Sequence, residues 1–289
     1  MAKITRISRE YKSRQVTVHQ KNHPLDPKTT VPKANQWPNR DPNFKPTATQ
    51  KGPPQTKVEN TARPVSRPAA TPTIPIIPIP SVVYTDGRSP LNNYFDKIFC
   101  INLDRRQDRW AQCITEFDKH KLCVERFAAV DGNTMRANGK LTTGEMGCCM
   151  SHVGVLKLMI ENRWNKILVL EDDISFLENL NEFWETNQKF IPETWNMLYL
   201  GGSHLNDPVH LNGPIYKISK TYTTSSYGIT LSMANSVVRN IETMGSQVDV
   251  MYSEVHRGGS SYTFKPSIAW QRAGISDVQG GFRDYNFLK

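Results

Sequence analysis

Features that direct a chain into the secretory pathway or across a membrane are missing from this sequence. The first twenty residues alternate charged and polar side chains and contain no apolar core of a signal peptide. The apolar stretch at residues 71–83 is too short to span a bilayer, and its repeated prolines prevent a helix. The last four residues, NFLK, are no retention signal. We therefore expect a cytoplasmic protein, with membrane association left open.

Cysteine is scarce and irregularly placed. The five cysteines are Cys100, Cys113, Cys123, Cys148 and Cys149. An odd count at irregular spacing indicates no disulfide framework, and the adjacent pair is not a zinc spacing. We expect reduced, partly buried thiols.

Acidic residues are few in the first 93 residues, which hold 15 Lys and Arg against 5 Asp and Glu, and 15 of the 19 prolines. The other 21 basic and 22 acidic residues lie in residues 94–289, so the basic pI near 9.3 belongs to the N-terminal segment. This segment cannot bury enough apolar surface to offset its ordering entropy. We predict a disordered basic tail at 1–93 and one compact domain at 94–289.

The charge distribution also limits the partners. The basic tail is expected to be a solvated linker or to dock to an acidic partner, a membrane surface or a nucleic acid. The nearly neutral domain lacks the basic face that nucleic acid requires, so we expect no specific nucleic-acid binding.

Strand-like and helix-like patterns alternate after residue 94. Strands are predicted at residues 95–103, 124–130, 167–170, 197–200, 215–218, 227–232 and 267–271. Helices are predicted at residues 110–119, 144–162, 183–190 and 234–244, with Asp249 in a short loop. The alternation predicts an α/β fold, with a mostly parallel central sheet and crossover helices.

Three carboxylates follow a run of four apolar residues. Residues 167–170 predict a strand buried on both faces, and ligands of open α/β sheets bind at the carboxyl ends of such strands. Glu171 and Asp173 lie on one side of an extended segment, with Asp172 between them. These acids suit Mg²⁺ or Mn²⁺, ions that commonly carry a diphosphate. They equally fit a solvated turn that caps the next helix.

A basic cluster follows the first predicted strand. Arg105 and Arg109 are four residues apart, with Arg106 between them and Asp104 before them. Guanidinium groups bind phosphate in a bidentate manner, and a helix N-terminus favours anions. The same residues also fit a surface turn of weak Asp–Arg pairs. If both clusters lie at one edge of the sheet, they suit a metal-bridged nucleotide.

The remaining candidates are weaker. Gly144 and Gly147 at a helix start allow close backbone approach. Ser151 and His152 lie two turns further on, and a lone histidine is more often a hydrogen-bonded core residue than a ligand. At Tyr227-Gly228 the glycine would bring the backbone close to a ligand. Asp249 and Glu254 are candidates for a general base. Gln271, Ser276 and Asp277 form a series of polar residues near the C-terminal end of the sequence that would close over a substrate.

Four motifs in register resemble glycosyltransferase family 25, which includes bacterial lipooligosaccharide galactosyltransferases and procollagen galactosyltransferases. They are Asn102-Leu103-Asp104-Arg105-Arg106-x-x-Arg109, Arg126-Phe127-x-Ala129-Val130-Asp131-Gly132, Gly144-Glu145-x-Gly147-Cys148-x-x-Ser151-His152 and Leu170-Glu171-Asp172-Asp173. Later pieces agree in order and spacing: Tyr227-Gly228-Ile229, Asp249, Pro266 to Gln271 and Ser276-Asp277. The resemblance covers about residues 95–280 and leaves out the tail.

The resemblance implies a GT-A-like fold, a UDP-hexose donor such as UDP-galactose or UDP-glucose, Mn²⁺ or Mg²⁺, and inversion at the anomeric carbon. The metal would fall on Glu171 and Asp173, and the base for a glycan or protein hydroxyl on Asp249, with Glu254 as the rival. The Glu-x-Asp order leaves open which carboxylate touches the ion. The residues expected at the nucleotide are Asn102, Asp104, Arg105, Arg106, Arg109, Glu145, Ser151, His152, Asp172 and Gln271.

Two other classes remain as alternatives. One is a catalytically inactive scaffold that binds a sugar or a nucleotide, although all the expected acids are present. The other is a metal-dependent nuclease or phosphotransferase, in which acid clusters also hold metal ions. The absence of targeting signals favours bacterial or viral glycan synthesis, such as lipopolysaccharide biosynthesis, over the procollagen setting.

Overall fold

The computed structural model describes residue 82 and residues 87–137, 139–244 and 246–285. The chain divides into two units, residues 1–70 and 71–289, and every described residue belongs to the second. The predicted disordered tail therefore lies almost entirely outside the described residues. The predicted domain start at residue 94 is too late, because Leu91 is fully buried and Val82 pairs through its backbone with Val124.

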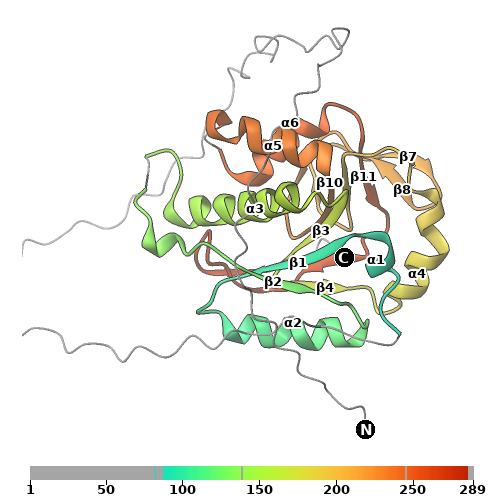
Figure 1. Ribbon diagram of the computed structural model, residues 1–289, viewed down its shortest axis with the longest axis horizontal. Coiled ribbons are helices and arrows are strands. Elements are labelled where there is room, and N and C mark those ends of the chain that lie inside the picture. Colours follow the sequence, from blue (N-terminus) through green and yellow to red (C-terminus); the bar gives the residue numbers. More distant parts are fainter. Residues whose placement is uncertain (1–81, 83–86, 138, 245, 286–289) are drawn as a thin grey trace, which may run out of the picture. The chain divides into compact units, whose positions relative to one another are not determined.

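A central sheet of eight strands runs through the described domain in the order β2-β1-β3-β10-β5-β11-β8-β7 (Figure 1). The strands are β1 (Lys97–Asn102), β2 (Glu125–Ala128), β3 (Lys166–Glu171), β5 (Met197–Tyr199), β7 (Val209–Asn212), β8 (Ile215–Lys217), β10 (Ser226–Thr230) and β11 (Ser261–Phe264). The pairings make all of them run in one direction except β8 and β10. The predicted α/β fold with a mostly parallel central sheet is confirmed.

Three small two-stranded sheets flank this sheet. They are β4 (Ile174–Phe176) with β12 (Ala269–Gln271), β6 (Ser203–His204) with β9 (Thr221–Tyr222), and β13 (Gly274–Ile275) with β14 (Phe282–Arg283). The β4–β12 pair matters for the site, because it ties the C-terminal part of the chain to the segment that directly follows the acidic cluster.

Helices cover both faces of the sheet (Figure 1). The helices are α1 (Leu91–Tyr94), α2 (Gln107–Lys119), α3 (Thr143–Asn162), α4 (Leu180–Asn187), α5 (Leu231–Met244) and α6 (Val248–His256), with 3₁₀ turns η1 (Gly132–Thr134) and η2 (Gln188–Phe190). Two hydrophobic cores result, one with α1, α2 and α4 and one with α3, α5 and α6. Among the described residues, no helix combines the length and apolarity that a bilayer span requires.

The strand before the acidic cluster is buried on both faces, as its sequence predicts. Leu168 and Leu170 contribute to the core with α2, while Ile167 and Val169 contribute to the core with α3. Alternate side chains of a strand point to opposite faces, so a continuous apolar run suits this position.

The start of α3 is fixed by its own residues. The Thr142 side chain accepts a hydrogen bond from the Glu145 backbone N–H, and the Glu145 carboxylate accepts one from the Thr142 N–H. The predicted close approach at the helix glycines is confirmed, because a Cβ at Gly147 would lie 2.7 Å from the Val130 carbonyl oxygen. Helix α3 is therefore held tightly against the turn that follows β2.

Three local predictions are wrong. Asp249 lies in the first turn of α6 and not in a loop. The acidic cluster does not cap a helix, because the next element is strand β4. Gly228 serves core packing and not a ligand, since a Cβ there would lie 2.8 Å from the Phe95 ring. The five thiols are free, as expected.

Candidate active site

A cavity opens at the carboxyl ends of β1 and β3. Its lining combines the acidic cluster, Arg105 and Arg109, the first turns of α3, the start of α6 and the C-terminal segment. The prediction that the acidic and the basic cluster share one sheet edge is confirmed. Arg109 Nη1 donates to Asp172 Oδ1 at 2.7 Å and to Asp173 Oδ2 at 3.3 Å.

Asp172 and Asp173 differ in how well their oxygens are satisfied. Asp172 accepts a hydrogen bond at each oxygen, from Arg109 and from Asn102 Nδ2 at 2.8 Å. Among the described residues, Asp173 Oδ1 is buried and has no hydrogen-bond partner. Burial, followed by the repulsion of Glu171, raises the pKa of Asp173 to about 7. An unsatisfied buried oxygen of this kind is costly and suits an additional cationic ligand.

Glu171 is held by Thr224 and His152. Its Oε1 accepts from Thr224 Oγ1 at 2.7 Å and lies 3.3 Å from His152 Nε2. Burial on its own raises the pKa of Glu171, but the hydrogen bond and charge of His152 and the bond from Thr224 outweigh it and lower the pKa. Glu171 is therefore the acid of the cluster that keeps its negative charge most readily.

The basic cluster bridges the sheet edge to the C-terminal segment. Arg105 contacts Asp131 at 3.0 Å and Asp277 at 2.7 Å, and Arg106 pairs with Asp277 as well. Arg109 Nη2 also donates to the Ile275 carbonyl at 2.7 Å. These contacts hold the C-terminal segment over the cavity, where a bound substrate would be covered.

Three predicted nucleotide-binding residues stand behind the cavity and do not line it. Asn102 orients Asp172 and also donates to the Arg106 carbonyl at 3.0 Å. Asp104 accepts from Arg126 Nη2 at 2.7 Å. Arg106 pairs with Asp277, which does line the cavity. These side chains position others, and their direct contact with a nucleotide is not supported by the geometry.

The two candidate bases are separated. Asp249 lines the cavity, and burial raises its pKa. Glu254 does not line it and pairs at 3.0 Å with Arg257, the residue that follows α6. The structure therefore favours Asp249 over Glu254 by position.

The other predicted residues occupy three different settings. Glu145 and Gln271 line the cavity. Ser151 also lines it, but its hydroxyl donates to the Gly147 carbonyl and accepts from the Val130 N–H, so it ties α3 to the turn after β2. His152 is 1% exposed and reaches the site through Glu171, so it is at once a core residue and a site residue.

Sequence reasoning missed three contributors to the site. Arg272 Nη2 donates to the Asp172 carbonyl at 2.9 Å and so fixes the acidic turn, while Thr224 fixes Glu171. Both depend on long-range packing, for which no local signal exists. Cys148 lies beside His152 and Glu171, and its spacing of four residues from His152 on a predicted helix was a readable signal.

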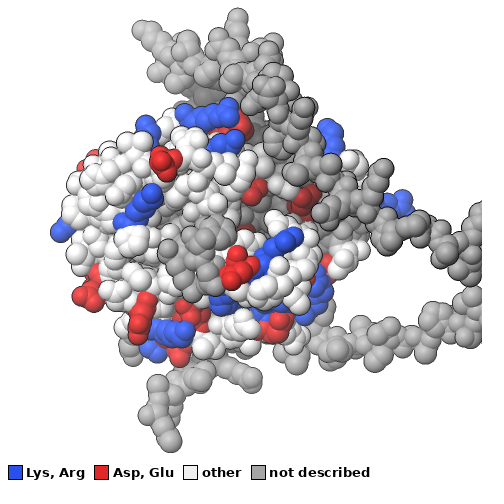
Figure 2. Space-filling view, turned by 180° about the vertical axis from the view of Figure 1, so that it is seen from behind, with Lys and Arg blue, Asp and Glu red and all other residues white. Residues whose placement is uncertain are grey.

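The surface charge of the domain is mixed. Figure 2 shows Lys and Arg side chains interspersed with Asp and Glu on the face it presents. This view agrees with the near-neutral charge of residues 94–289.

Comparison with known proteins identifies the family of the chain. Residues 95–252 match the family described as glycosyltransferase family 25 (LPS biosynthesis protein). A procollagen lysyl hydroxylase and glycosyltransferase of Acanthamoeba polyphaga mimivirus is 32% identical over 48% of this chain and 19% of its own length. Mouse procollagen galactosyltransferase 2 is 28% identical over 50% of this chain and 27% of its own. The chain thus spans under a third of the length of each of these two relatives.

Two further similarities are to a relative that is named inactive and to a distantly similar solved structure. The mouse protein named inactive glycosyltransferase 25 family member 3 is 25% identical over 49% of this chain and 28% of its own length. A solved glycosyltransferase involved in glycosylation of the major capsid of PBCV-1 is 10% identical, with a TM-score of 0.38 over 63% of this chain and 95% of its own. A likeness at that level assigns no function. The match over residues 95–252 covers more than half of the chain, and the chain belongs to glycosyltransferase family 25.

Proposed function

We propose that the chain is an inverting, metal-dependent glycosyltransferase that moves a hexose from a UDP-sugar to a hydroxyl of a glycan or protein acceptor. The observation that carries the proposal is the buried Asp173 Oδ1 beside Glu171, which has no hydrogen-bond partner in the described part of the chain. This oxygen lies at the same cavity as the cationic Arg105 and the half-buried acid Asp249. A donor diphosphate bridged by a divalent cation would satisfy the acids and the arginine together.

The acidic residues fit a hard divalent cation. Glu171 and Asp173 would hold Mn²⁺ or Mg²⁺ through carboxylate oxygens, the ligand type that these ions prefer. When bound, the ion supplies Lewis-acid stabilisation of the charge that develops on the leaving UDP. Arg109 neutralises one charge of Asp172 and Asp173, so the acidic cluster is only partly compensated by this arginine.

Arg105 is suited to bind the diphosphate of the donor. Its side chain is 42% exposed, and its present partners Asp131 and Asp277 are held by partly exposed ion pairs, which are weak. A phosphate can therefore replace them at little cost, and a guanidinium binds it in a bidentate manner. Asp277 would then be released to Arg106, which contacts it already.

Asp249 is suited to accept the proton of the acceptor hydroxyl. Burial raises its pKa, which makes its carboxylate a better proton acceptor than an exposed aspartate. Its Oδ1 accepts from the Val250 N–H at 2.8 Å, which fixes its orientation in the first turn of α6. Attack of the activated hydroxyl on the anomeric carbon, with departure of UDP from the opposite face, inverts the configuration.

A donor screen tests the proposal. The full chain is incubated with Mn²⁺ and UDP-glucose, UDP-galactose or UDP-GlcNAc, together with glycan and collagen-like peptide acceptors, and UDP release is measured. We expect release with one hexose donor and an inverted anomeric configuration of the product by NMR. Binding of UDP without any release would instead favour an inactive nucleotide-binding protein, a class present among the relatives.

A further inference from the structure

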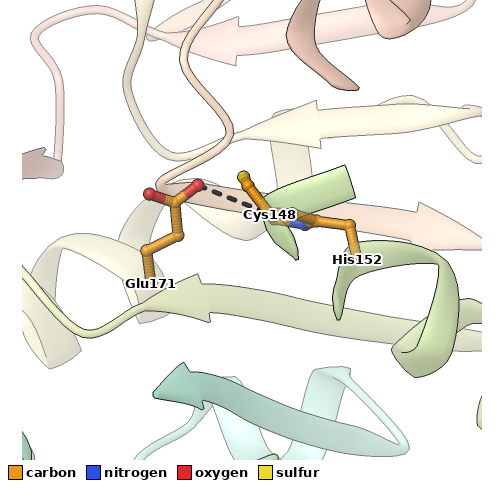
Figure 3. Close-up of side chains that lie close together, drawn as sticks. All are labelled: Cys148, His152 and Glu171. Atoms are coloured by element: carbon orange, nitrogen blue, oxygen red, sulfur yellow. Dashed lines mark hydrogen bonds and ion pairs between the residues drawn. The ribbon is translucent and has the colours of Figure 1, made fainter. Parts of the chain in front are cut away.

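Three side chains of different chemistry meet beside the acidic cluster. One ligand atom each of Cys148, His152 and Glu171 lies within 4.8 Å of the other two. Figure 3 shows Cys148 and His152 extending from helix α3 toward Glu171 at the end of β3. Residues four apart share a helix face, so the local fold itself places the thiol and the imidazole together.

The surroundings of His152 already match those of a metal-binding histidine. His152 Nδ1 lies 2.9 Å from the Tyr227 hydroxyl, which in turn lies 3.0 Å from the Tyr252 hydroxyl. The ion would replace the proton on Nε2 that faces Glu171. With Nδ1 protonated and donating to Tyr227, Nε2 then presents its lone pair to the ion. A second hydrogen bond of this kind orients metal-ligating histidines and fixes their tautomer.

We propose that Cys148 Sγ, His152 Nε2 and Glu171 Oε1 bind a thiophilic divalent cation of the Zn²⁺ type. This donor set differs from the all-oxygen set of Glu171 and Asp173, and a thiolate selects Zn²⁺ over Mg²⁺ or Mn²⁺. Ligand atoms around tetrahedral zinc lie about 3.5 Å apart, as zinc–ligand bonds of roughly 2.0–2.3 Å require. His152 Nε2 and Glu171 Oε1 already lie 3.3 Å apart.

The site is of the open kind. All three side chains line the cavity, so a fourth position on the ion faces the space in which a substrate would bind. Binding releases the Cys148 thiol proton to solvent, because the thiolate is the ligand. Thr224 continues to donate to Glu171 Oε1 and keeps that carboxylate in place.

Glu171 would be a ligand of both proposed cations, so zinc binding should affect sugar transfer; this expectation rests on the proposed function. A zinc ion on Cys148 and His152 would draw Glu171 away from the cation that Glu171 and Asp173 hold together. Zinc would therefore inhibit transfer, and the inhibition would require Cys148. The binding itself does not depend on any transfer activity.

Cobalt substitution and zinc competition test the binding. Co²⁺ added to the full, reduced chain should give one sulfur-to-cobalt charge-transfer band, which stoichiometric Zn²⁺ removes and excess Mg²⁺ does not. Cys148→Ser should lose the band and weaken zinc binding by more than about tenfold, measured against a chromophoric chelator. Cys123→Ser, at a half-buried thiol outside this cluster, is the matched control and should bind as the wild type does.

The result that overturns the proposal is equal zinc affinity of wild type and Cys148→Ser. Circular dichroism checks that Cys148→Ser is folded, and Cys148→Ala replaces it if it is not. In an active preparation, zinc should lower UDP release by the wild type by a larger factor than it lowers UDP release by Cys148→Ser, each relative to its own zinc-free rate. Failure of UDP release with every donor would reject the proposed function, while the cobalt band would still decide the zinc site.

Discussion

Replacing Asp173 with Asn should stabilise the protein in the absence of divalent cations while removing its capacity to hold one. Asp173 lies beside Glu171, and its buried Oδ1 has no hydrogen-bond partner among the described residues. Ionisation of this carboxylate in the folded protein is therefore unfavourable. The amide of Asn has nearly the same shape and no charge.

The expected size follows from the pKa of Asp173, which burial and Glu171 raise from 3.8 to about 7. The unfolded chain loses the proton near pH 4 and the folded chain near pH 7, so stability falls as the pH rises between these values. Above pH 7 the full cost is about 4 kcal/mol, at 1.36 kcal/mol per pKa unit. A buried amide donor without a partner costs roughly 1–2 kcal/mol in return. We expect a net gain of about 2–3 kcal/mol at pH 8 that vanishes near pH 5.

Urea unfolding with EDTA at pH 5 and pH 8 measures this difference. Asp277→Asn serves as the contrast, because Asp277 is paired with Arg105 and Arg106, and its loss should lower stability by no more than about 1 kcal/mol. If Asp173→Asn is less stable than the wild type at pH 8, or if its effect does not change with pH, the reasoning on the buried carboxylate is wrong.

Three further perturbations address other parts of the account. His256 is buried, its Nδ1 accepts a backbone N–H, and burial lowers its pKa to about 4. The contribution of His256 to the free energy of unfolding should therefore be fully present above pH 6.5 and fall by up to about 3 kcal/mol as the pH drops toward 4. The melting temperature of the His256→Gln variant should decrease less steeply with falling pH than that of the wild type. Gly147→Ala should lose on the order of 1–3 kcal/mol, because the Cβ would meet a backbone carbonyl oxygen at 2.7 Å, whereas Met150→Ala on the exposed side of α3 should change little. Asp249→Asn should abolish transfer and keep UDP binding by calorimetry, whereas Glu254→Gln should retain activity; equal activity of the two variants would exclude Asp249 as the base.

The sequence predicted those elements whose signal is local. The run at residues 167–170 is apolar at every position, which suits a strand covered on both faces, and the structure places its side chains in two cores. Helix α6 was missed although Val248, Met251, Tyr252 and Val255 have helical spacing, because Asp249 was interpreted first as a loop acid.

The site was predictable in so far as strand ends determine it. The clusters after β1 and β3 meet because parallel neighbours end at the same edge, and Arg109 does contact Asp172. The contacts of Arg272 could not be predicted, since they depend on the pairing of β12 with β4 across about a hundred residues of chain. The hydrogen bond from Asn102 to Asp172 likewise could not be predicted, because it depends on how the two side chains are oriented.

Binding of UDP to the wild type and to Asp173→Asn, measured by calorimetry with Mn²⁺ and with EDTA, tests the central claim most directly. We expect Mn²⁺ to strengthen UDP binding to the wild type by at least about tenfold, equivalent to 1.4 kcal/mol, and to leave the variant unchanged. Equal affinity of the wild type with Mn²⁺ and with EDTA would contradict the assignment of Glu171 and Asp173 as the anchor of a metal-bridged diphosphate.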